Sequence, residues 1–320
     1  MLDKQLDTLL AHARAAGMPD LCDLPIPAAR GLYTQLTSGT GAAPEGVAVR
    51  ERPAAAGVPR LRLYTPLADG VLPVVVWYHG GGYVLGSLDD YDTLCRQLSV
   101  QAQALVVAVD YRLAPEHAYP AAFDDAWAAL QWLTSEAGLA WLGAGADIKR
   151  LALAGDSAGA VLAAATCLQA RDHGGPAITF QALAYPPAAG GYDGDFASRT
   201  SFAAGPTLTL RTMDWFNRLC FGDAGRAADT RGAPLHAASL AGLPPALVQL
   251  ASHDALRDEA LAFAQRLRAE GNTLTLVEFL GLAHGYLGQG GLVHAAGVAQ
   301  RQLGRSLHDA LHVAAGAVGG

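Results

Sequence analysis

Short apolar runs alternate with longer amphipathic segments over most of the chain. The run Pro73–Tyr78 is apolar at every position, which is typical of a strand buried on both faces of a sheet. Further strands are predicted near 46–51, 61–65, 104–109, 150–154, 178–184, 245–251 and 274–280. Helices are predicted at 88–102, 121–136, 158–172, 257–270 and 292–314. This alternation predicts an α/β fold with a mostly parallel central sheet and helices on both faces.

Two segments break the alternation. Residues 1–45 hold two helical patterns, over 3–16 and from Pro27 to about Thr37, and residues 188–235 hold the pattern Leu210–Cys220. Long insertions in a compact fold are often lids or binding loops. We therefore predict a helical cap made of these two segments over a core of residues 46–187 and 236–320. The alternative is that the second segment only packs on the core surface.

The composition indicates a globular protein with a large core. Hydrophobic residues make up 51% of the chain and charged residues only 16%, against about 25% in typical domains. The net charge is −7 without a basic run, so we expect no nucleic-acid partner. The apolar run near Val71–Tyr78 is too short to span a membrane, and the N-terminus lacks the pattern of a signal peptide. We expect a soluble, cytoplasmic protein.

The cysteines are scattered, without a Cys-x-x-Cys motif or a His/Cys cluster at metal-binding spacing. They are Cys22, Cys95, Cys167 and Cys220. Their apolar, helix-like surroundings favour reduced, buried thiols over two disulfides. We predict neither a metal nor another cofactor.

Residues 155–159 read Gly-Asp-Ser-Ala-Gly between a predicted buried strand and a predicted helix. In that context the pattern is the signature of a nucleophile elbow, in which a tight turn exposes the side chain of Ser157. The glycines omit side chains for which such a turn has no room. The N-terminus of the following helix favours developing negative charge. The alternative is a glycine-rich turn with an incidental serine.

A nucleophilic serine needs a base, and the base needs an acid that orients it. Asp254 follows the predicted strand 245–251, and His284 follows the strand 274–280, so both lie at the edge where ligands bind parallel sheets. His253 is disfavoured, because adjacent strand residues point to opposite faces. The remaining histidines considered do not follow a strand after the acid; they are His12, His173, His236, His294, His308 and His312.

The loop His79–Tyr83 follows the strand Pro73–Tyr78 and holds three consecutive glycines. Such a loop lets backbone N–H groups approach a substrate, and together with Ala158, the residue after the nucleophile, it predicts an oxyanion hole. The alternatives are a flexible loop or a phosphate cradle. The second is disfavoured because no Walker lysine follows and Asp156 would repel a phosphate.

Charged residues elsewhere receive supporting roles. The block Asp110–Pro120 follows the next strand, and we predict that its charges tie this loop to the oxyanion loop, with Glu116 and His117 in supporting positions. Asp258 and Glu259 lie in the first turn of a predicted helix, where carboxylates complement the helix dipole, so we interpret them as structural.

Five motifs in this order resemble the hormone-sensitive lipase family of α/β-hydrolases, specifically its bacterial family IV carboxylesterases. They are His79–Gly82, Asp110–Glu116, Gly155–Gly159, Asp254–Asp258 and His284–Tyr286. The resemblance runs from about residue 45 to 310, and the N-terminal helices resemble that family's cap.

The resemblance implies hydrolysis of carboxylic esters, usually with short acyl chains. It assigns the nucleophile to Ser157, the base to His284 and the acid to Asp254. It assigns the oxyanion N–H groups to Gly81, Gly82 and Ala158. Two residues depart from the family pattern: Ala160 stands where glycine is usual, and Ala255 where proline is frequent. Both changes bear on rate or fit rather than on the reaction.

The substrate is less well defined than the chemistry. The predicted pocket residues are Tyr83, Leu210, Met213, Trp215 and Phe216, with simple packing of the cap as the alternative for each. We expect a small-molecule ester as substrate, although lactone, amide or acyl-sugar hydrolysis uses the same machinery. A non-catalytic small-molecule receptor on a hydrolase scaffold is the alternative of a different class. The edge strand 274–280 could pair with a second copy in a homodimer.

Overall fold

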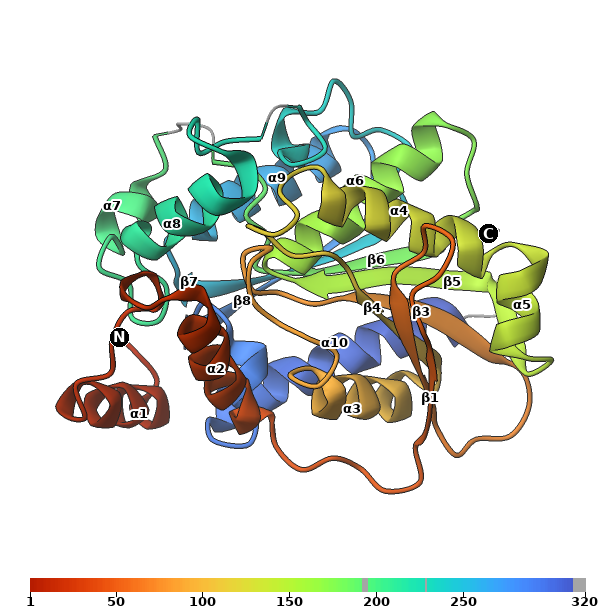
Figure 1. The fold of residues 1–320 in the computed structure, drawn as a ribbon, viewed down its shortest axis with the longest axis horizontal. Helices are drawn as coiled ribbons and strands as arrows, with labels where there is room; N and C mark the ends of the chain where they lie inside the picture. The colour runs from red at the N-terminus through yellow and green to blue at the C-terminus, as the bar shows by residue number, and fades with distance from the viewer. Residues whose placement is uncertain (192–194, 228, 313–320) are drawn as a thin grey trace.

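The computed structural model describes residues 1–191, 195–227 and 229–312. Its strands are β1 (Ala48–Arg52), β2 (Arg60–Thr65), β3 (Leu72–Tyr78), β4 (Leu105–Asp110), β5 (Ala146–Asp156), β6 (Phe180–Ala184), β7 (Ala246–His253) and β8 (Leu274–Ala283). Within the described residues they form one eight-stranded sheet in the order β1-β2-β4-β3-β5-β6-β7-β8 (Figure 1). Strand β2 is antiparallel to β1 and β4, and every other neighbouring pair is parallel. The predicted α/β architecture is confirmed.

Helices cover both faces of the sheet (Figure 1). One face carries α4 (Ala121–Leu133), α6 (Ala158–Asp172) and α9 (Arg257–Ala269), and the other carries α3 (Asp92–Ala102) and α10 (His294–His312). This arrangement explains the continuous apolar run of β3. Val74 and Val76 pack into the first layer, whereas Val75 and Trp77 pack into the second.

The two segments outside the alternation are helical and lie at one end of the sheet, on the left of Figure 1. They contain α1 (Lys4–Ala15), α2 (Ile26–Thr37), α7 (Ala197–Ser201) and α8 (Leu210–Phe221). The helices expected at 3–16, 27–37 and 210–220 correspond to α1, α2 and α8, whereas α7 was not predicted. Short 3-10 helices complete the chain: η1 (Leu21–Asp23), η2 (Ser38–Thr40), η3 (Pro234–His236) and η4 (Tyr286–Gln289).

The helix predicted at 121–136 is two helices, α4 and α5 (Glu136–Leu142). The break follows from local chemistry, because the side chain of Ser135 accepts a hydrogen bond from the N–H of Gly138 and so caps a new helix. A Cβ atom at Gly138 would lie 2.0 Å from the carbonyl oxygen of Trp132. Only glycine fits at this sharp turn between the two helices.

Other elements differ from prediction in their ends. Strand β5 begins at Ala146 and β8 continues to Ala283, several residues beyond the apolar runs that predicted them. The last two residues of the helix expected at 292–314 lie outside the described residues. All four cysteines are unpaired, and all but Cys22 are buried. In the part of the chain that the structure describes, no helix is both long and apolar enough to cross a membrane.

Candidate active site

Ser157 stands in the turn between β5 and α6 with φ of 50° and ψ of −122°. A positive φ is unusual for a residue other than glycine. It is held in place in part because the N–H of Ser157 donates to the carbonyl of Ala184 on β6 (2.8 Å). A Cβ at Gly159 would lie 1.9 Å from the carbonyl oxygen of Tyr78, and one at Gly155 would lie 2.5 Å from the backbone of Gly159. Both glycines are therefore required by the close approach of α6 to β3.

A continuous hydrogen-bond chain joins the three residues predicted for catalysis. The Oγ atom of Ser157 lies 2.9 Å from Nε2 of His284, and Nδ1 of His284 lies 2.7 Å from Oδ2 of Asp254. Asp254 is 1% exposed, and its other oxygen accepts from the N–H of Leu256 (2.9 Å). A carboxylate beside Nδ1 favours the tautomer in which Nδ1 carries the proton, which leaves Nε2 to accept the proton of the serine hydroxyl.

The position of His284 is fixed by two further contacts. Its imidazole packs edge-on against the ring of Tyr185, with centroids 4.9 Å apart. Its carbonyl oxygen accepts a hydrogen bond from the hydroxyl of Thr207 (2.8 Å), which belongs to the segment 188–235. The second predicted cap segment therefore reaches the backbone of the histidine itself.

The backbone N–H groups predicted for the oxyanion hole make no hydrogen bonds to the described part of the protein. Within the described residues, no group accepts a hydrogen bond from the N–H of Gly81, Gly82 or Ala158. Ala158 is the first residue of α6, where helical N–H groups lack intrahelical partners. Gly81 and Gly82 have φ of 111° and 61°, and a Cβ at Gly81 would lie 2.3 Å from the carbonyl oxygen of Leu85. The loop can take this shape only with glycine at that position.

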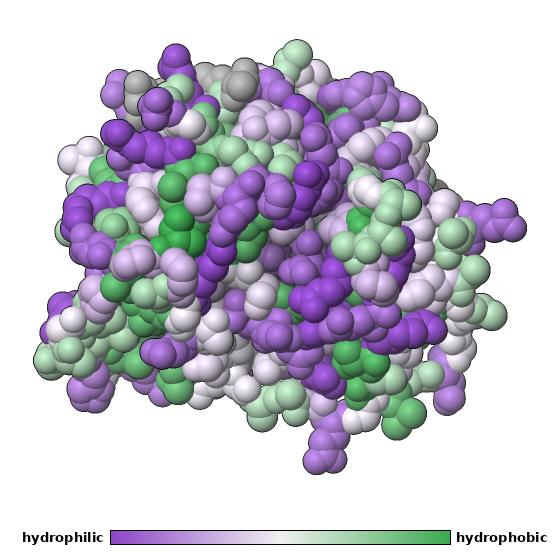
Figure 2. Space-filling model, viewed as in Figure 1, coloured by the Kyte–Doolittle hydropathy of each residue, from purple (hydrophilic) through white to green (hydrophobic). Residues whose placement is uncertain are grey.

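One of the predicted pocket residues lies directly on the oxyanion loop. A Cβ at Gly82 would lie 2.3 Å from the ring of Phe216, so this ring covers the glycine. Phe216 also packs against Trp215, with ring centroids 5.1 Å apart. Leu210 and Met213 are partly exposed on the same helix, α8. Figure 2 shows apolar residues gathered between α8 and α2, on the face seen in Figure 1.

Tyr83 is placed differently from the other predicted pocket residues. Its side chain is 5% exposed, and its ring packs between those of Phe123 and Phe221, with centroid distances of 5.4 and 5.8 Å. The tyrosine has φ of 64°, so the backbone of the loop remains left-handed for two residues after Gly81. In this position Tyr83 anchors the end of the loop in the core.

The block Asp110–Pro120 contacts the oxyanion loop through an uncharged side chain, and its predicted charge contact is indirect: Glu116 binds Arg30, which donates to the carbonyl of Val84 just after the loop. The hydroxyl of Tyr111 donates to the carbonyl of His79 (2.7 Å), and the two rings stack with centroids 4.2 Å apart. The charged residues of the block pair elsewhere: Arg112 with Asp125 on α4 and Glu116 with Arg30 on α2. Sequence reasoning overlooked Tyr111 because its charged neighbours gave the stronger signal.

The carboxylates that follow Asp254 hold the segment 188–235 to helix α9. Oδ2 of Asp258 accepts from the N–H of Ser198 on α7 (2.8 Å). Glu259 is buried, pairs with Arg199 and accepts from the N–H of Ala189. Burial raises the pKa of Glu259 above its usual value, and the neighbouring guanidinium opposes this shift. These contacts agree with the structural interpretation of both residues.

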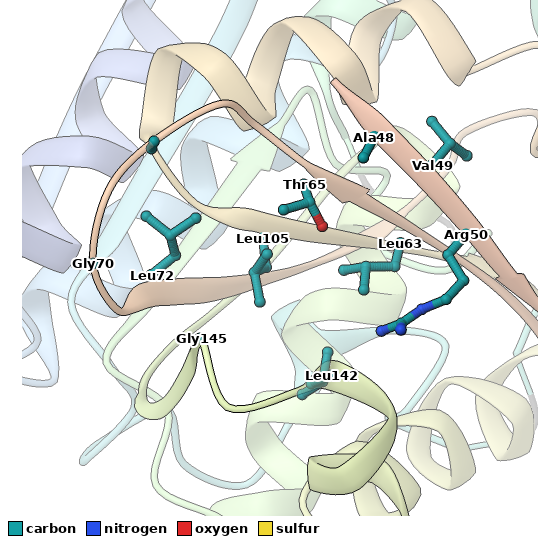
Figure 3. Close-up of a pocket in the computed structure, with 11 residues that line it drawn as sticks. Ala48, Val49, Arg50, Leu63, Thr65, Gly70, Leu72, Leu105, Leu142 and Gly145 are labelled. Carbon is teal, nitrogen blue, oxygen red and sulfur yellow. The ribbon is translucent and has the colours of Figure 1, made fainter. Parts of the chain in front are cut away.

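Neither a metal-binding cluster nor the hollow drawn in Figure 3 indicates a second functional site among the described residues. Among the described residues, no group of three or more His, Cys, Asp or Glu side chains could hold a metal ion. The hollow drawn in Figure 3 is lined by Leu72 and Leu105, which begin β3 and β4, and by Leu142 of α5. It therefore lies toward the opposite end of the parallel strands from Ser157, and its lining is mostly apolar.

Comparisons with known proteins identify the family of this chain. A family model described as the alpha/beta hydrolase fold matches residues 75–288, which is more than half of the chain. The chain belongs to the α/β-hydrolase family. The matched range contains Ser157, Asp254 and His284, together with the loop that follows β3.

Within the family, the chain is similar to two esterases and to a receptor. Esterase LipI of Mycobacterium tuberculosis is 44% identical over 225 residues, which cover 70% of this chain and 68% of the relative. The crystal structure of a thermostable esterase from Pseudomonas putida matches with a TM-score of 0.89 and 36% identity, covering 98% of both chains. The gibberellin receptor GID1A of Arabidopsis thaliana is 34% identical over 227 residues, covering 68% of this chain and 63% of the receptor. The two esterases confirm the resemblance to the hormone-sensitive lipase family and the prediction of a hydrolase.

The contact between α6 and β3 predicts a large effect of one methyl group. We expect Gly159→Ala to lower the free energy of unfolding by about 3 kcal/mol, because the new Cβ would overlap a backbone oxygen that cannot move aside. Gly31→Ala in α2 is the matched control, since no atom lies within 4 Å of its Cβ position, and it should raise the stability by about 0.4–1 kcal/mol. Urea unfolding measures both. Equal effects of the two substitutions would contradict this account of the elbow.

Proposed function

We propose that this protein is a serine carboxylesterase that hydrolyses short-chain carboxylic esters through an acyl-enzyme intermediate. The observation that carries the proposal is the unbroken hydrogen-bond chain from Asp254 through His284 to Ser157. A serine so placed has a base for its proton, and the base has an acid that holds it in one tautomer.

The first half of the reaction transfers the acyl group to the enzyme. Oγ of Ser157 attacks the ester carbonyl carbon while Nε2 of His284 takes the hydroxyl proton. The carbonyl oxygen becomes an oxyanion and accepts hydrogen bonds from the N–H groups of Gly81, Gly82 and Ala158. The bond to the alcohol oxygen then breaks, the alcohol leaves with the proton from His284, and an acyl-serine remains.

The second half releases the acid. Water gives a proton to Nε2 of His284 and attacks the acyl-serine carbonyl, so a second oxyanion forms in the same hole. Its collapse returns the proton to Oγ of Ser157 and frees the carboxylic acid. Throughout both halves Asp254 orients the imidazole and stabilises its cationic form, which its burial favours by excluding water. These steps use only groups of this chain, the ester and water.

The segments 1–45 and 188–235 are proposed to form a cap that decides which ester reaches Ser157. The segments contact each other, because the carboxylate of Asp20 accepts hydrogen bonds from the hydroxyls of Thr209 and Thr212. Burial alone would raise the pKa of Asp20, but these hydrogen bonds outweigh it, and the pKa lies below its usual value. Asp23 adds an ion pair with Arg211. These contacts join the two segments to each other.

Two alternatives remain beside the proposal. A receptor function has a precedent in the family, since two relatives bear that name. A receptor needs no proton relay beside its serine, however, and the intact relay favours catalysis. Lactone, amide or acyl-sugar hydrolysis uses the same atoms, and profiling hydrolysis of each class against matched esters separates them.

The central test removes the nucleophile. We expect Ser157→Ala to lower turnover of p-nitrophenyl butyrate by about 10⁴-fold or more, because the proton relay then has no nucleophile to activate. Ser38→Ala is the matched control, since its exposed hydroxyl bonds only within its own helix turn. An organophosphonate should label the wild-type protein at residue 157, as read by peptide mass spectrometry. Wild-type turnover in Ser157→Ala would refute the proposal.

The ring over the oxyanion loop should limit acyl length. We expect Phe216→Ala to raise the ratio of kcat/KM for an octanoate ester to that for an acetate ester by about tenfold, because the space of the ring becomes available to the chain. Arg218→Ala on the exposed side of α8 is the control and should leave the ratio unchanged. An unchanged profile in Phe216→Ala would assign the ring to packing of the cap.

The exposed edge of the sheet supports a homodimer. Among the described residues, strand β8 pairs with β7 alone, Asp3 covers its end by donating to the carbonyl of Gly281, and no strand pairs with the outer edge of residues 274–280. Leu276 and Leu280 on this strand are 40% and 79% exposed. We propose that two copies pair their β8 edges across a twofold axis.

Charge on that edge should separate the two copies. Leu280→Lys is expected to convert a dimer to a monomer in sedimentation velocity, since a lysine at a strand edge opposes edge pairing. Leu67→Lys, at a position 90% exposed in a loop, should leave the dimer intact. A monomeric wild-type protein at micromolar concentration would overturn this proposal and would leave the esterase proposal untouched.

A further inference from the structure

A buried cluster holds the first glycine of the oxyanion loop, Gly80. The N–H of Gly80 donates to Oδ1 of Asp156 (2.8 Å) and to the hydroxyl of Tyr91 (3.0 Å). The hydroxyl of Tyr91 in turn donates to Oδ2 of Asp156 (3.0 Å). Tyr91 and Asp156 are 6% and 4% exposed, and a Cβ at Gly80 would lie 2.5 Å from Oδ2 of Asp156. The start of the loop is therefore clamped to the residue that precedes Ser157.

The hydroxyl of Tyr91 also links this cluster to helix α2, through Tyr33. A tyrosine hydroxyl has one proton and can accept two hydrogen bonds. The proton of Tyr91 goes to Asp156 and one acceptor site takes the N–H of Gly80, so the remaining contact, with the hydroxyl of Tyr33 (2.8 Å), must have Tyr33 as donor. Burial raises the pKa of both tyrosines far above neutrality, so each keeps its proton. Tyr33 thereby completes the bonding of Tyr91 and fixes its orientation.

The same face of α2 also holds the residue that directly follows the loop, Val84. Arg30 lies three residues before Tyr33 and so one helical turn away on the same side. Its Nε donates to the carbonyl of Val84 (3.0 Å) and its Nη2 to that of Ala114 (3.2 Å), while Glu116 binds the guanidinium through both oxygens. Helix α2 thus contacts Val84, the residue after the loop, directly, and it contacts Gly80 within the loop through Tyr91.

We propose that helix α2 holds the oxyanion loop in position. Tyr33, acting through Tyr91 and Asp156, is a positioning residue for the N–H groups of that loop. The inference rests on the proposed function, in which Gly81 and Gly82 stabilise the oxyanion. Because that contact is strongest in the transition state, loosening the clamp lowers kcat and leaves KM nearly unchanged. A helix that only covered the pocket would act on KM or on stability.

The test is a double-mutant cycle that removes two hydroxyl groups. We expect Tyr91→Phe to lower kcat for p-nitrophenyl butyrate by about tenfold, a fraction of the roughly 10²–10³-fold cost of losing an oxyanion donor outright. Tyr33→Phe should lower kcat by about threefold, with KM within about twofold of wild type in both variants. The double variant should match Tyr91→Phe alone, because Tyr33 acts only through the hydroxyl that Tyr91→Phe has removed.

A matched control and a second readout distinguish positioning from packing. Tyr64→Phe also removes a buried hydroxyl, one that takes no part in the contacts of Gly80, Tyr91 and Asp156, and should leave kcat unchanged. Butylboronic acid forms a tetrahedral adduct on an active serine, so its Ki should rise by the same factor by which kcat/KM falls in each variant. If Tyr91→Phe does not fold, Tyr33→Phe alone still tests the proposal, because it removes the hydroxyl that contacts Tyr91 and leaves Tyr91 itself in place.

The outcomes separate failure of this inference from failure of the proposed function. A wild-type protein without Ser157-dependent turnover would overturn both. The wild-type protein could instead be active while Tyr33→Phe and Tyr91→Phe lower kcat no more than the control Tyr64→Phe does. That result would overturn the role of helix α2 and leave the esterase proposal intact. Multiplicative losses in the double variant would also overturn the role of helix α2, since Tyr33 would then act by a route that bypasses Tyr91.

Discussion

The close approach of helix α6 to the end of strand β3 is the contact on which the site depends. The carbonyl oxygen of Tyr78 occupies the space that a side chain at Gly159 would need. Because the helix begins there, the chain must turn within a single residue, and Ser157 takes φ of 50°. The loop that follows Tyr78 leaves from the same point. One backbone contact therefore sets the nucleophile beside the N–H groups proposed to receive the oxyanion.

Burial of charge is the cost of this arrangement. Desolvation raises the pKa of Asp156 to about 6, although hydrogen bonds from Tyr91, Gly80 and Tyr185 favour the charged form. The value exceeds the unfolded value of 3.8, so the carboxyl favours folding most below pH 4 and loses that contribution as the pH rises to about 6. The difference corresponds to about 3 kcal/mol at neutral pH. If position 156 served packing alone, an apolar side chain there would make the folded protein more stable than Asp156 does.

The sequence predicts the parts of the site that depend on local order. Strand ends locate Ser157, Asp254 and His284, because parallel strands finish at one edge of the sheet and each of these residues directly follows such a strand. The clamp on the oxyanion loop is not local. Tyr33 and Tyr91 are 58 residues apart and Tyr91 and Asp156 are 65 apart, and no periodicity in a single sequence indicates which hydroxyl meets which carboxylate. The turn at Ser135 was overlooked for a different reason, because helix propensity continues across it.

The two proposed cap segments meet the same stretch of chain, residues 79–84, from different directions. Helix α8 sets Phe216 on Gly82, where acyl length is proposed to be limited, whereas α2 reaches Val84 through Arg30. The segments are joined to each other at Asp20. A substitution that reshapes the pocket from α8 therefore strains a loop that α2 holds, and the strain falls on the N–H groups proposed for the oxyanion. In this architecture substrate choice and rate are coupled through the loop, so a change of cap sequence alters both unless the clamp at Gly80 is kept.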